Sequence, residues 1–375
     1  GFPVSVPSVD LVEIGAGGGS LARVDQFGLL KVGPESSGAD PGPASYGQGG
    51  TIPAVTDSDV ILGLLDPAAF LGGDMPLDRS LAESAAQTVA DGLGLEMLDT
   101  AAGIHEVVNQ NMAAAASMHG VEMGVDLRGI PLIAFGGAGP VHACGVAELL
   151  ESDRVIFPVN ASVLSAFGTL VSPVRIDLAR SMPRLIDKVT DDERDHLLDE
   201  LRNEGRRVLR GAGVPDDAII FRYGVDARYS GQGNEITIWV GEGDAWPATA
   251  ADVTSAFEIE YRRIYGMTIP DVAVEAITWR LSASATTSHV EPDDSIAPHE
   301  GDVVPKSTRP MVFSRGVDAV EAPVYDRLTL GAGARFTGPA VVEERETTSV
   351  IRPGWDVEVA ADGSLIASRT VKEST

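Results

Sequence analysis

The sequence is poor in lysine, cysteine and aromatic residues. Acidic residues outnumber lysine and arginine by 55 to 28, which gives a formal net charge of −27 at pH 7. So large an acidic excess argues against nucleic acid, and against an anionic membrane surface, as a partner. Cys144 is the only cysteine, so an internal disulfide is excluded, and we expect a cytoplasmic protein in which this thiol is buried. The lysines are Lys31, Lys188, Lys306 and Lys372.

Several familiar signatures are also absent. No apolar run is long enough to cross a bilayer, and we expect no signal peptide and no membrane partner. The metal motifs His-Glu-x-x-His and Cys-x-x-Cys do not occur, and neither does the nucleophile elbow Gly-x-Ser-x-Gly. The six histidines are dispersed, so we predict no metal site, and surface or capping roles for His105 and His119. What remains is the composition of a globular protein of two or three domains.

Residues 130–143 are the stretch around which the chain is organised. The apolar run 130–135 predicts a strand buried on both faces, glycines then break it, and Pro140 fits the first position of a helix that runs to Leu150. Glycine lets the backbone approach a ligand closely, and a helix N-terminus offers free N–H groups. A tight strand–helix corner that needs glycine only for packing is the alternative. His142 lies in the first helical turn, where the dipole favours a neutral imidazole that either contacts a ligand or caps and packs.

A second glycine-rich loop covers residues 15–20 and precedes a predicted hairpin over 21–32. Because a hairpin follows instead of a helix, the loop lacks the anion-binding helix terminus of a dinucleotide fingerprint, and it also lacks the lysine of a P-loop. The long loop 32–50 is either functional or a solvated connection. Asp57 precedes a predicted helix at 60–65, and we expect it to cap that helix or to orient a water or metal.

The pattern of elements divides the chain into three predicted parts. Residues 1–180 hold both glycine segments, and a mixed α+β domain is predicted over 181–290. In that domain the capping sequence from Thr190 opens a helix with one apolar stripe, and residues 218–229 and 235–240 read as paired strands. Short strands and turns predict a small β-rich domain over 300–375.

Several segments, in order along nearly the whole chain, resemble the hydantoinase A/5-oxoprolinase family. They are Ile14-Gly15-Ala16-Gly17-Gly18-Gly19-Ser20, Val32-Gly33-Pro34-Glu35-Ser36, Pro41-Gly42-Pro43, Tyr46-Gly47, Val55-Thr56-Asp57, Phe135-Gly136-Gly137-Ala138-Gly139-Pro140-Val141-His142-Ala143, Leu164-Ser165-Ala166-Phe167-Gly168, Asp226-Ala227-Arg228-Tyr229-Ser230-Gly231-Gln232 and Thr337-Gly338-Pro339-Ala340. The chain departs from the family pattern at Asp126-Leu127-Arg128-Gly129, where an Asp-Pro-Arg sequence is usual.

The resemblance implies an α/β fold with a ribonuclease-H-like half-core of the actin, sugar kinase and Hsp70 superfamily. On that resemblance residues 1–180 would form the ATP-binding core, with ATP and Mg²⁺ as cofactors. The cofactor-binding positions it implies are Gly17, Gly18, Gly19, Gly136, Gly137, Ala138, Gly139 and Pro140. The two Asp-Gly-Gly-Thr phosphate loops of the superfamily do not occur, so the chain resembles only the carboxy-terminal portion of such a subunit. Asp57 and His142 are the polar candidates for catalysis that remain.

By resemblance, the expected activity is ATP-dependent ring opening of a cyclic amide such as a hydantoin or 5-oxoproline. The first alternative is a subunit of an ATP-dependent ketone carboxylase of the acetone or acetophenone type. The second is a non-catalytic scaffold that lacks the phosphate loops. Both enzyme hypotheses imply a hetero-oligomer with a hydantoinase B-type partner. We expect activity to need this partner and the segment upstream of this chain.

Overall fold

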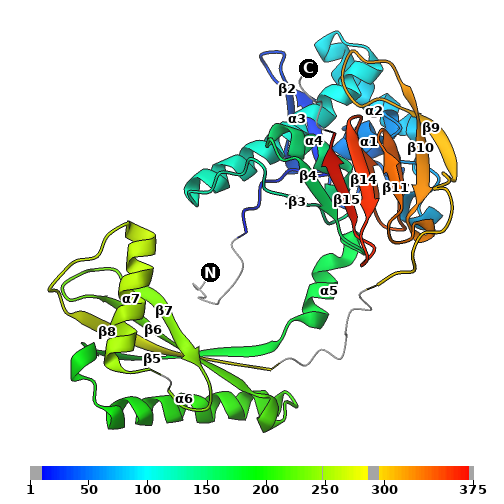
Figure 1. The fold of residues 1–375 in the computed structure, drawn as a ribbon. Helices are drawn as coiled ribbons and strands as arrows, with labels where there is room; N and C mark the ends of the chain where they lie inside the picture. Colours follow the sequence, from blue (N-terminus) through cyan, green and yellow to red (C-terminus); the bar gives the residue numbers. More distant parts are fainter. Residues whose placement is uncertain (1–10, 247, 286–294, 371–375) are drawn as a thin grey trace, which may run out of the picture. The chain divides into compact units, whose positions relative to one another are not determined.

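The computed structural model describes residues 11–246, 248–285 and 295–370. Within these ranges the chain forms two compact units (Figure 1). We call residues 11–166 together with 295–370 the site unit, and residues 167–285 the α+β unit. The predicted boundary near residue 290 lies outside the described residues. None of the described helices combines the length and apolar character that a membrane-spanning segment needs.

The first half of the site unit is a hairpin followed by packed helices. Strands β1 (Ser20–Val24) and β2 (Leu30–Ser36) pair antiparallel, as the sequence predicted for this hairpin. Helix α3 packs against α1, α2 and α4. Its alanine-rich surface allows this close approach, because small side chains keep the helix axes near each other. The four helices are α1 (Val55–Ile61), α2 (Arg79–Leu93), α3 (Met97–Glu122) and α4 (Gly139–Leu149).

A five-stranded sheet joins the middle of the sequence to its C-terminal part. Its order is β11-β14-β15-β4-β3, in which β3 and β4 are parallel and β4 and β15 antiparallel. These strands lie side by side in Figure 1. Val155, Phe157, Trp355 and Leu365 share one apolar core. The strands are β3 (Leu132–Ile133), β4 (Arg154–Phe157), β11 (Arg335–Thr337), β14 (Trp355–Val359) and β15 (Leu365–Arg369).

The predicted strand at 130–135 forms differently from the expectation. It was predicted to be buried on both faces, but β3 has two residues and lies at the edge of the sheet, and Ile133 is 55% exposed. The prediction was wrong because an apolar run does not say whether another layer of the fold covers each face of the strand. The strands predicted over 300–375 do form, and they share the sheet and core of residues 132–157.

The remaining sheet of the site unit packs on α1. Its order is β13-β12-β10-β9, and Met311, Val324, Val341 and Val350 share a core with Val60 and Ile61 of α1. Gly63 makes this packing possible, because a Cβ there would lie 2.3 Å from the carbonyl oxygen of Pro310. The strands are β9 (Ser307–Met311), β10 (Val320–Asp326), β12 (Ala340–Glu343) and β13 (Thr348–Ile351).

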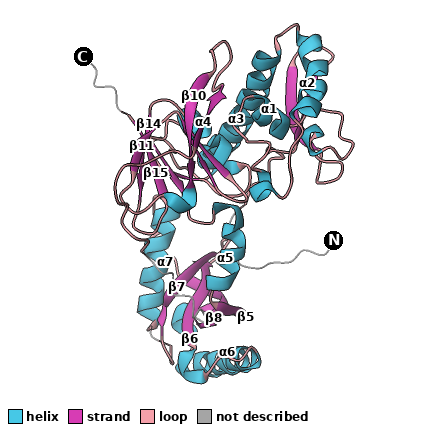
Figure 2. Ribbon diagram, turned by 90° about the vertical axis from the view of Figure 1, so that its right-hand side faces the viewer, coloured by secondary structure: helices cyan, strands magenta, loops and turns pink. Residues whose placement is uncertain are grey.

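The α+β unit is a four-stranded antiparallel sheet with helices α6 and α7 packed on it (Figure 2). Alternate residues of β6, from Phe221 to Tyr229, are buried under these helices. The predicted capping of α6 is confirmed, because the Thr190 hydroxyl accepts a hydrogen bond from Glu193 N. The elements are α5 (Leu164–Val171), β5 (Val174–Leu185), α6 (Asp191–Gly211), β6 (Ile220–Tyr229), β7 (Ile236–Glu242), α7 (Ala250–Tyr265) and β8 (Val274–Ala285). The predicted mixed α/β class is confirmed.

Candidate active site

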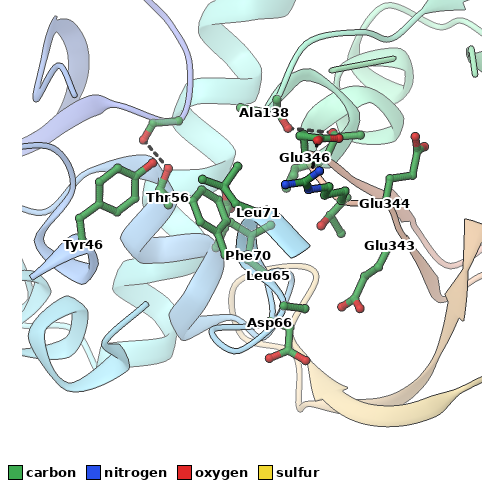
Figure 3. Close-up of a pocket in the computed structure, with 18 of the residues that line it drawn as sticks. Tyr46, Thr56, Leu65, Asp66, Phe70, Leu71, Ala138, Glu343, Glu344 and Glu346 are labelled. Atoms are coloured by element: carbon green, nitrogen blue, oxygen red, sulfur yellow. Dashed lines mark hydrogen bonds and ion pairs between the residues drawn. The ribbon is translucent and has the colours of Figure 1, made fainter. Parts of the chain in front are cut away.

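A cavity of about 340 Å³ lies in the site unit, within the size range of small-molecule sites. It is built from the loop before β1, from α1 and the loop after it, from the start of α4 and from the β12–β13 connection (Figure 3). Its lining residues are Gly18, Gly19, Tyr46, Thr56, Asp59, Leu65, Asp66, Ala69, Phe70, Leu71, Gly137, Ala138, Val141, Glu343, Glu344, Arg345, Glu346, Thr347 and Thr348.

The cavity brings together the two glycine segments that the sequence singled out. Gly18 and Gly19 line it from one side, and Gly137 and Ala138 from the other. A Cβ added at Gly18 would lie 2.8 Å from the Thr56 hydroxyl oxygen and 3.4 Å from Ala138 Cβ, so glycine is what allows this loop to pack closely on Thr56 and Ala138. The other predicted positions, Gly17, Gly136, Gly139 and Pro140, adjoin these segments without contributing to the lining.

Hydrogen bonds fix both segments. The Thr56 hydroxyl donates to Gly18 O at 2.9 Å, and the Thr56 backbone N–H donates to the same oxygen at 2.8 Å. The Thr347 hydroxyl, from the β12–β13 connection, lies 2.9 Å from Gly137 O and 3.2 Å from Gly136 O. Gly136 adopts a φ of 89°, a left-handed conformation that favours glycine. The turn is therefore held in one conformation before any ligand binds.

The two walls of the cavity differ in character. Tyr46, Leu65, Phe70 and Leu71 form an apolar wall, and the rings of Tyr46 and Phe70 lie 5.8 Å apart. Carboxylates dominate the facing wall in Figure 3. Burial raises the pKa of Tyr46, and the nearby charge of Asp57 adds to this rise. The acidic side chains in the lining are Asp59, Asp66, Glu343, Glu344 and Glu346.

We call Glu343, Glu344 and Glu346 the acidic wall. Basic side chains beside these residues balance part of their charge. Arg309 Nη1 lies 2.8 Å from a carboxylate oxygen of Glu343 and 3.3 Å from one of Asp66. Lys306 is 2.7 Å from the other oxygen of Glu343. Burial raises the pKa of Glu344, and the Arg327 guanidinium opposes this rise. Glu346 contacts Arg345 at 3.5 Å. This wall suits hydroxyl donors or a cation better than a bare anion.

Asp57 is a capping residue in the structure. It is fully buried in the first turn of α1, and its carboxylate accepts hydrogen bonds from the backbone N–H groups of Ala44, Ser45 and Ala54. These bonds fix residues 44–45 of the long loop beside the cavity. The helix predicted at 60–65 begins earlier, at Val55, so Asp57 lies in its first turn instead of before it, and it caps the helix by accepting from the N–H of Ala54. The carboxylate is not part of the cavity lining.

His142 belongs to a buried polar cluster behind the cavity. Its Nδ1 lies 2.8 Å from Asn109 Oδ1, and its Nε2 lies 3.6 Å from Asp59 Oδ2. His105 Nδ1 contacts Asp59 Oδ1 at 2.8 Å. Helices α1, α3 and α4 supply these four residues, which we call the Asp–His cluster: Asp59, His105, Asn109 and His142. The surface or capping role predicted for His105 is wrong, because this side chain is buried against Asp59.

Burial controls the charge of this cluster. It lowers the pKa of His142 to about 4, although the carboxylate of Asp59 opposes the change. It also lowers the pKa of His105 to about 3, with a further decrease from Arg352. Burial raises the pKa of Asp59 to about 7 against the opposing effect of His142. Both imidazoles are therefore neutral near pH 7, as expected for His142 from its helical position.

Sequence reasoning missed Asp59, His105 and Asn109 as members of a site. His105 and Asn109 are four residues apart and share one face of α3, which the sequence could have shown. Their approach to Asp59, 46 residues away from His105, depends on helix packing and leaves no local signal. The predicted burial of Cys144 is confirmed, and burial raises the pKa of this thiol to about 12.

Two family models match the chain in succession. The model described as Hydantoinase/oxoprolinase matches residues 1–178, and the Hydantoinase/oxoprolinase C-terminal domain matches residues 190–365. Caprolactamase subunit alpha of Pseudomonas jessenii is 34% identical over 363 residues, which are 96% of this chain and 52% of that subunit. The chain therefore spans about half the length of this relative.

Two solved structures resemble the whole described fold. An acetone carboxylase in its nucleotide-free form, from work on ATP-dependent acetone carboxylation, matches with a TM-score of 0.77 and 27% identity over 94% of this chain and 52% of the other. The ATP-dependent caprolactamase of Pseudomonas jessenii matches with a TM-score of 0.76 and 32% identity over 95% of this chain and 52% of the other. The mixed α/β fold, the two glycine segments at one cavity and the successive matches of both family models show that this chain belongs to the hydantoinase/oxoprolinase family.

Proposed function

We propose that the cavity binds the nucleotide of ATP, and that the chain is part of a hydantoinase A-type subunit that opens a cyclic amide. The observation that carries this proposal is the meeting of Gly18 and Gly19 with Gly137 and Ala138 at one cavity. Two family members with the same fold are named as enzymes of ATP-dependent reactions. The scaffold alternative gives no reason for an open, glycine-lined cavity.

The residues of the cavity fit a nucleotide. Gly18 packs closely on Thr56 and Ala138 and also lines the cavity, so a ligand can approach its backbone there. The apolar wall of Tyr46, Phe70 and Leu71 offers a surface for a base, and the facing carboxylates can accept hydrogen bonds from ribose hydroxyls. Val141, in the first turn of α4, lines the same cavity.

The acidic wall makes Mg²⁺ part of the proposal. A phosphate chain beside Glu344 and Glu346 would be repelled unless a cation lay between them, and carboxylates are oxygen ligands that suit Mg²⁺. ATP, when bound, would supply a phosphoryl group for the amide oxygen, which would make the ring carbonyl carbon electrophilic enough for water to attack, so that the ring C–N bond could break. The chain's own residues position the nucleotide: Thr56 and Thr347 hold the glycine segments, and Asp57 holds the loop beside them. We assign Asp57 and His142 positioning roles, since neither lines the cavity.

Sequence identity favours a cyclic amide over a ketone as substrate. The caprolactamase structure is 32% identical to this chain and the acetone carboxylase structure 27%, whereas their TM-scores are nearly equal. Caprolactamase, by its name, acts on a lactam, which is a cyclic amide. Its matching chain is named a subunit, so we propose a hetero-oligomer in which a hydantoinase B-type subunit contributes the rest of the substrate site.

The test is phosphate release from ATP by this chain, produced with its natural flanking sequence and its co-expressed partner. Caprolactam, hydantoin, 5-oxoproline, and acetone with bicarbonate are the substrates to compare. Release that depends on a cyclic amide and not on bicarbonate supports the proposal. Release that needs both ketone and bicarbonate makes the protein a carboxylase subunit. If no substrate caused phosphate release and the chain bound no nucleotide, only the non-catalytic scaffold alternative would remain.

A further inference from the structure

We infer that Asp59, His105 and His142 form a binding site for one divalent transition-metal ion, of which Zn²⁺ is the simplest candidate. The site goes beyond the proposed function, because His105 and His142 do not line the cavity in which ATP and Mg²⁺ would bind. One ligand atom from each of the three residues lies within 4.8 Å of the other two. The residues come from α1, α3 and α4, so a bound ion would link three helices.

The three side chains are close enough to share one small ion, provided that the two imidazole rings rotate. Ligand bonds of about 2.0–2.1 Å in a tetrahedral site place the ligand atoms roughly 3.3 Å apart. Asp59 Oδ1 and His105 Nδ1 are 2.8 Å apart, and Asp59 Oδ2 and His142 Nε2 are 3.6 Å apart. Each imidazole therefore contacts a different oxygen of the same carboxylate. The two rings lie 4.6 Å apart between centroids with an interplanar angle of 31°, so both must turn to direct a nitrogen at one ion.

The unpartnered nitrogen of His142 is the observation that points most directly to a ligand. His142 is fully buried, and its Nε2 has no hydrogen-bond partner. Its Nδ1 faces the amide oxygen of Asn109, which can only accept, so Nδ1 carries the hydrogen and Nε2 presents a lone pair. A buried acceptor without a partner is costly, and a metal ion would satisfy it.

Asn109 acts as an orienting partner of the kind that histidine ligands use in metal sites. Its own position depends on Gly145 of α4, because a Cβ there would lie 2.6 Å from Asn109 Nδ2. The sequence thus supplies a ligand, the group that fixes its tautomer, and the glycine that makes room for that group. A buried histidine without a metal would also need an acceptor for its N–H, so it is the unpartnered Nε2 that distinguishes a ligand site from a core histidine.

The donor set defines the class of ion. Two imidazole nitrogens and one carboxyl oxygen suit Zn²⁺ and other first-row divalent ions, whereas Mg²⁺ and Ca²⁺ prefer oxygen ligands alone. Three protein ligands leave a position open for another group. Asp59 also lines the cavity, so the open position would lie at the cavity's inner wall. The competing arrangement is a metal-free network in which Asp59 shares protons with the two histidines.

Metal content and the spectrum of bound Co²⁺ test the inference on the full chain without nucleotide. After removal of metal with a chelator, we expect one equivalent of Zn²⁺ or Co²⁺ per chain, and Co²⁺ should give the intense visible absorption of a low-coordinate site. His142→Gln should abolish stoichiometric binding. Asn109→Ala should weaken it by roughly 10–100-fold, the usual effect of losing an orienting partner. His196→Gln, at an exposed histidine of α6, is the matched control and should bind like the wild type.

A measurement on the wild-type chain tests the inference even if the variants do not fold. Zn²⁺ should shift the ring ¹⁵N resonances of two histidines only, one through Nδ1 and one through Nε2. Substoichiometric metal in the wild type, or equal binding by His142→Gln and His196→Gln, would overturn the inference and leave the proton-sharing network. Because no nucleotide is present, this result is separate from success or failure of ATP turnover.

Discussion

Gly18 is the residue through which the loop before β1 packs on Thr56 and Ala138 beside the cavity. It adopts no left-handed φ, so the reason for glycine here is room and not backbone freedom. Thr56 and Ala138 approach it from two different helices, one of which begins at the central glycine turn. A side chain at position 18 would therefore push the loop before β1 away from Thr56 and Ala138 and distort the cavity lining.

We expect Gly18→Val to weaken nucleotide binding by at least roughly 10-fold, or about 1.4 kcal/mol, because its Cβ would collide with the Thr56 hydroxyl. Titration with a fluorescent ATP analogue measures the effect. Gly211→Val is the matched control, since no atom lies within 4 Å of a Cβ at that position in α6. Equal affinities for the two variants would show that the nucleotide does not occupy this cavity.

Cys144 gives a second prediction at the residue scale. The side chain is completely buried in α4, and burial raises the pKa of its thiol to about 12, so thiolate is scarce and reagents cannot reach it. We expect no reaction with a thiol reagent such as 5,5′-dithiobis(2-nitrobenzoic acid) in the native protein, and one thiol per chain after unfolding in guanidinium chloride. Rapid native labelling would contradict the packing of α4 described here.

At the scale of elements, the sequence predicts what local patterns control. The hairpin over 21–32 and the capped helix from Thr190 form as expected, because turn and capping residues act within a few positions. The burial of β3 was not predictable, since the neighbour that would cover it must come from elsewhere in the chain. The contact of His105 with Asp59 was missed for the same reason: packing of α1 on α3 creates it.

Arg309 of β9 connects the four-stranded sheet to the loop after α1 through hydrogen bonds and an ion pair. Its Nε donates to Gly63 O at 2.6 Å, its Nη2 donates to Leu64 O at 3.1 Å, and its Nη1 pairs with the buried carboxylate of Glu343. Both backbone oxygens follow α1, and Glu343 ends β12 beside the cavity. This one side chain therefore joins two walls of the candidate site.

We expect Arg309→Met to destabilise the protein by about 3 kcal/mol, because it leaves a buried carboxylate with fewer partners and removes two hydrogen bonds to backbone oxygens. Urea unfolding measures the change. Arg335→Met is the control: Arg335 pairs with Glu358 at 2.9 Å, but both side chains are more than half exposed, so little change is expected. Similar losses for both variants would mean that the Arg309 contacts contribute no more than a surface ion pair.

At the scale of the whole molecule, the site unit is discontinuous in sequence. Residues 295–370 complete the sheet of β4 through β15 and supply one wall of the cavity, although the α+β unit separates them in the chain from residues 11–166. Sequence reasoning found the family and the two glycine segments because each motif is local. It assigned residues 300–375 to a separate part, because strand pairing across some 200 residues has no local signature.

This discontinuity predicts unequal effects of two deletions. Removing residues 295–375 should unfold the site unit, because β4 loses its antiparallel partner and Val155 and Phe157 lose the core formed with Trp355 and Leu365. Replacing residues 172–285 by a flexible linker should leave the site unit folded, because its sheets and cores include no residue of that segment. Near-UV circular dichroism and limited proteolysis distinguish the two products. If the chain without residues 295–375 kept a cooperative unfolding transition and bound nucleotide with unchanged affinity, then residues 11–166 would form the site alone, and the acidic wall would have no part in it.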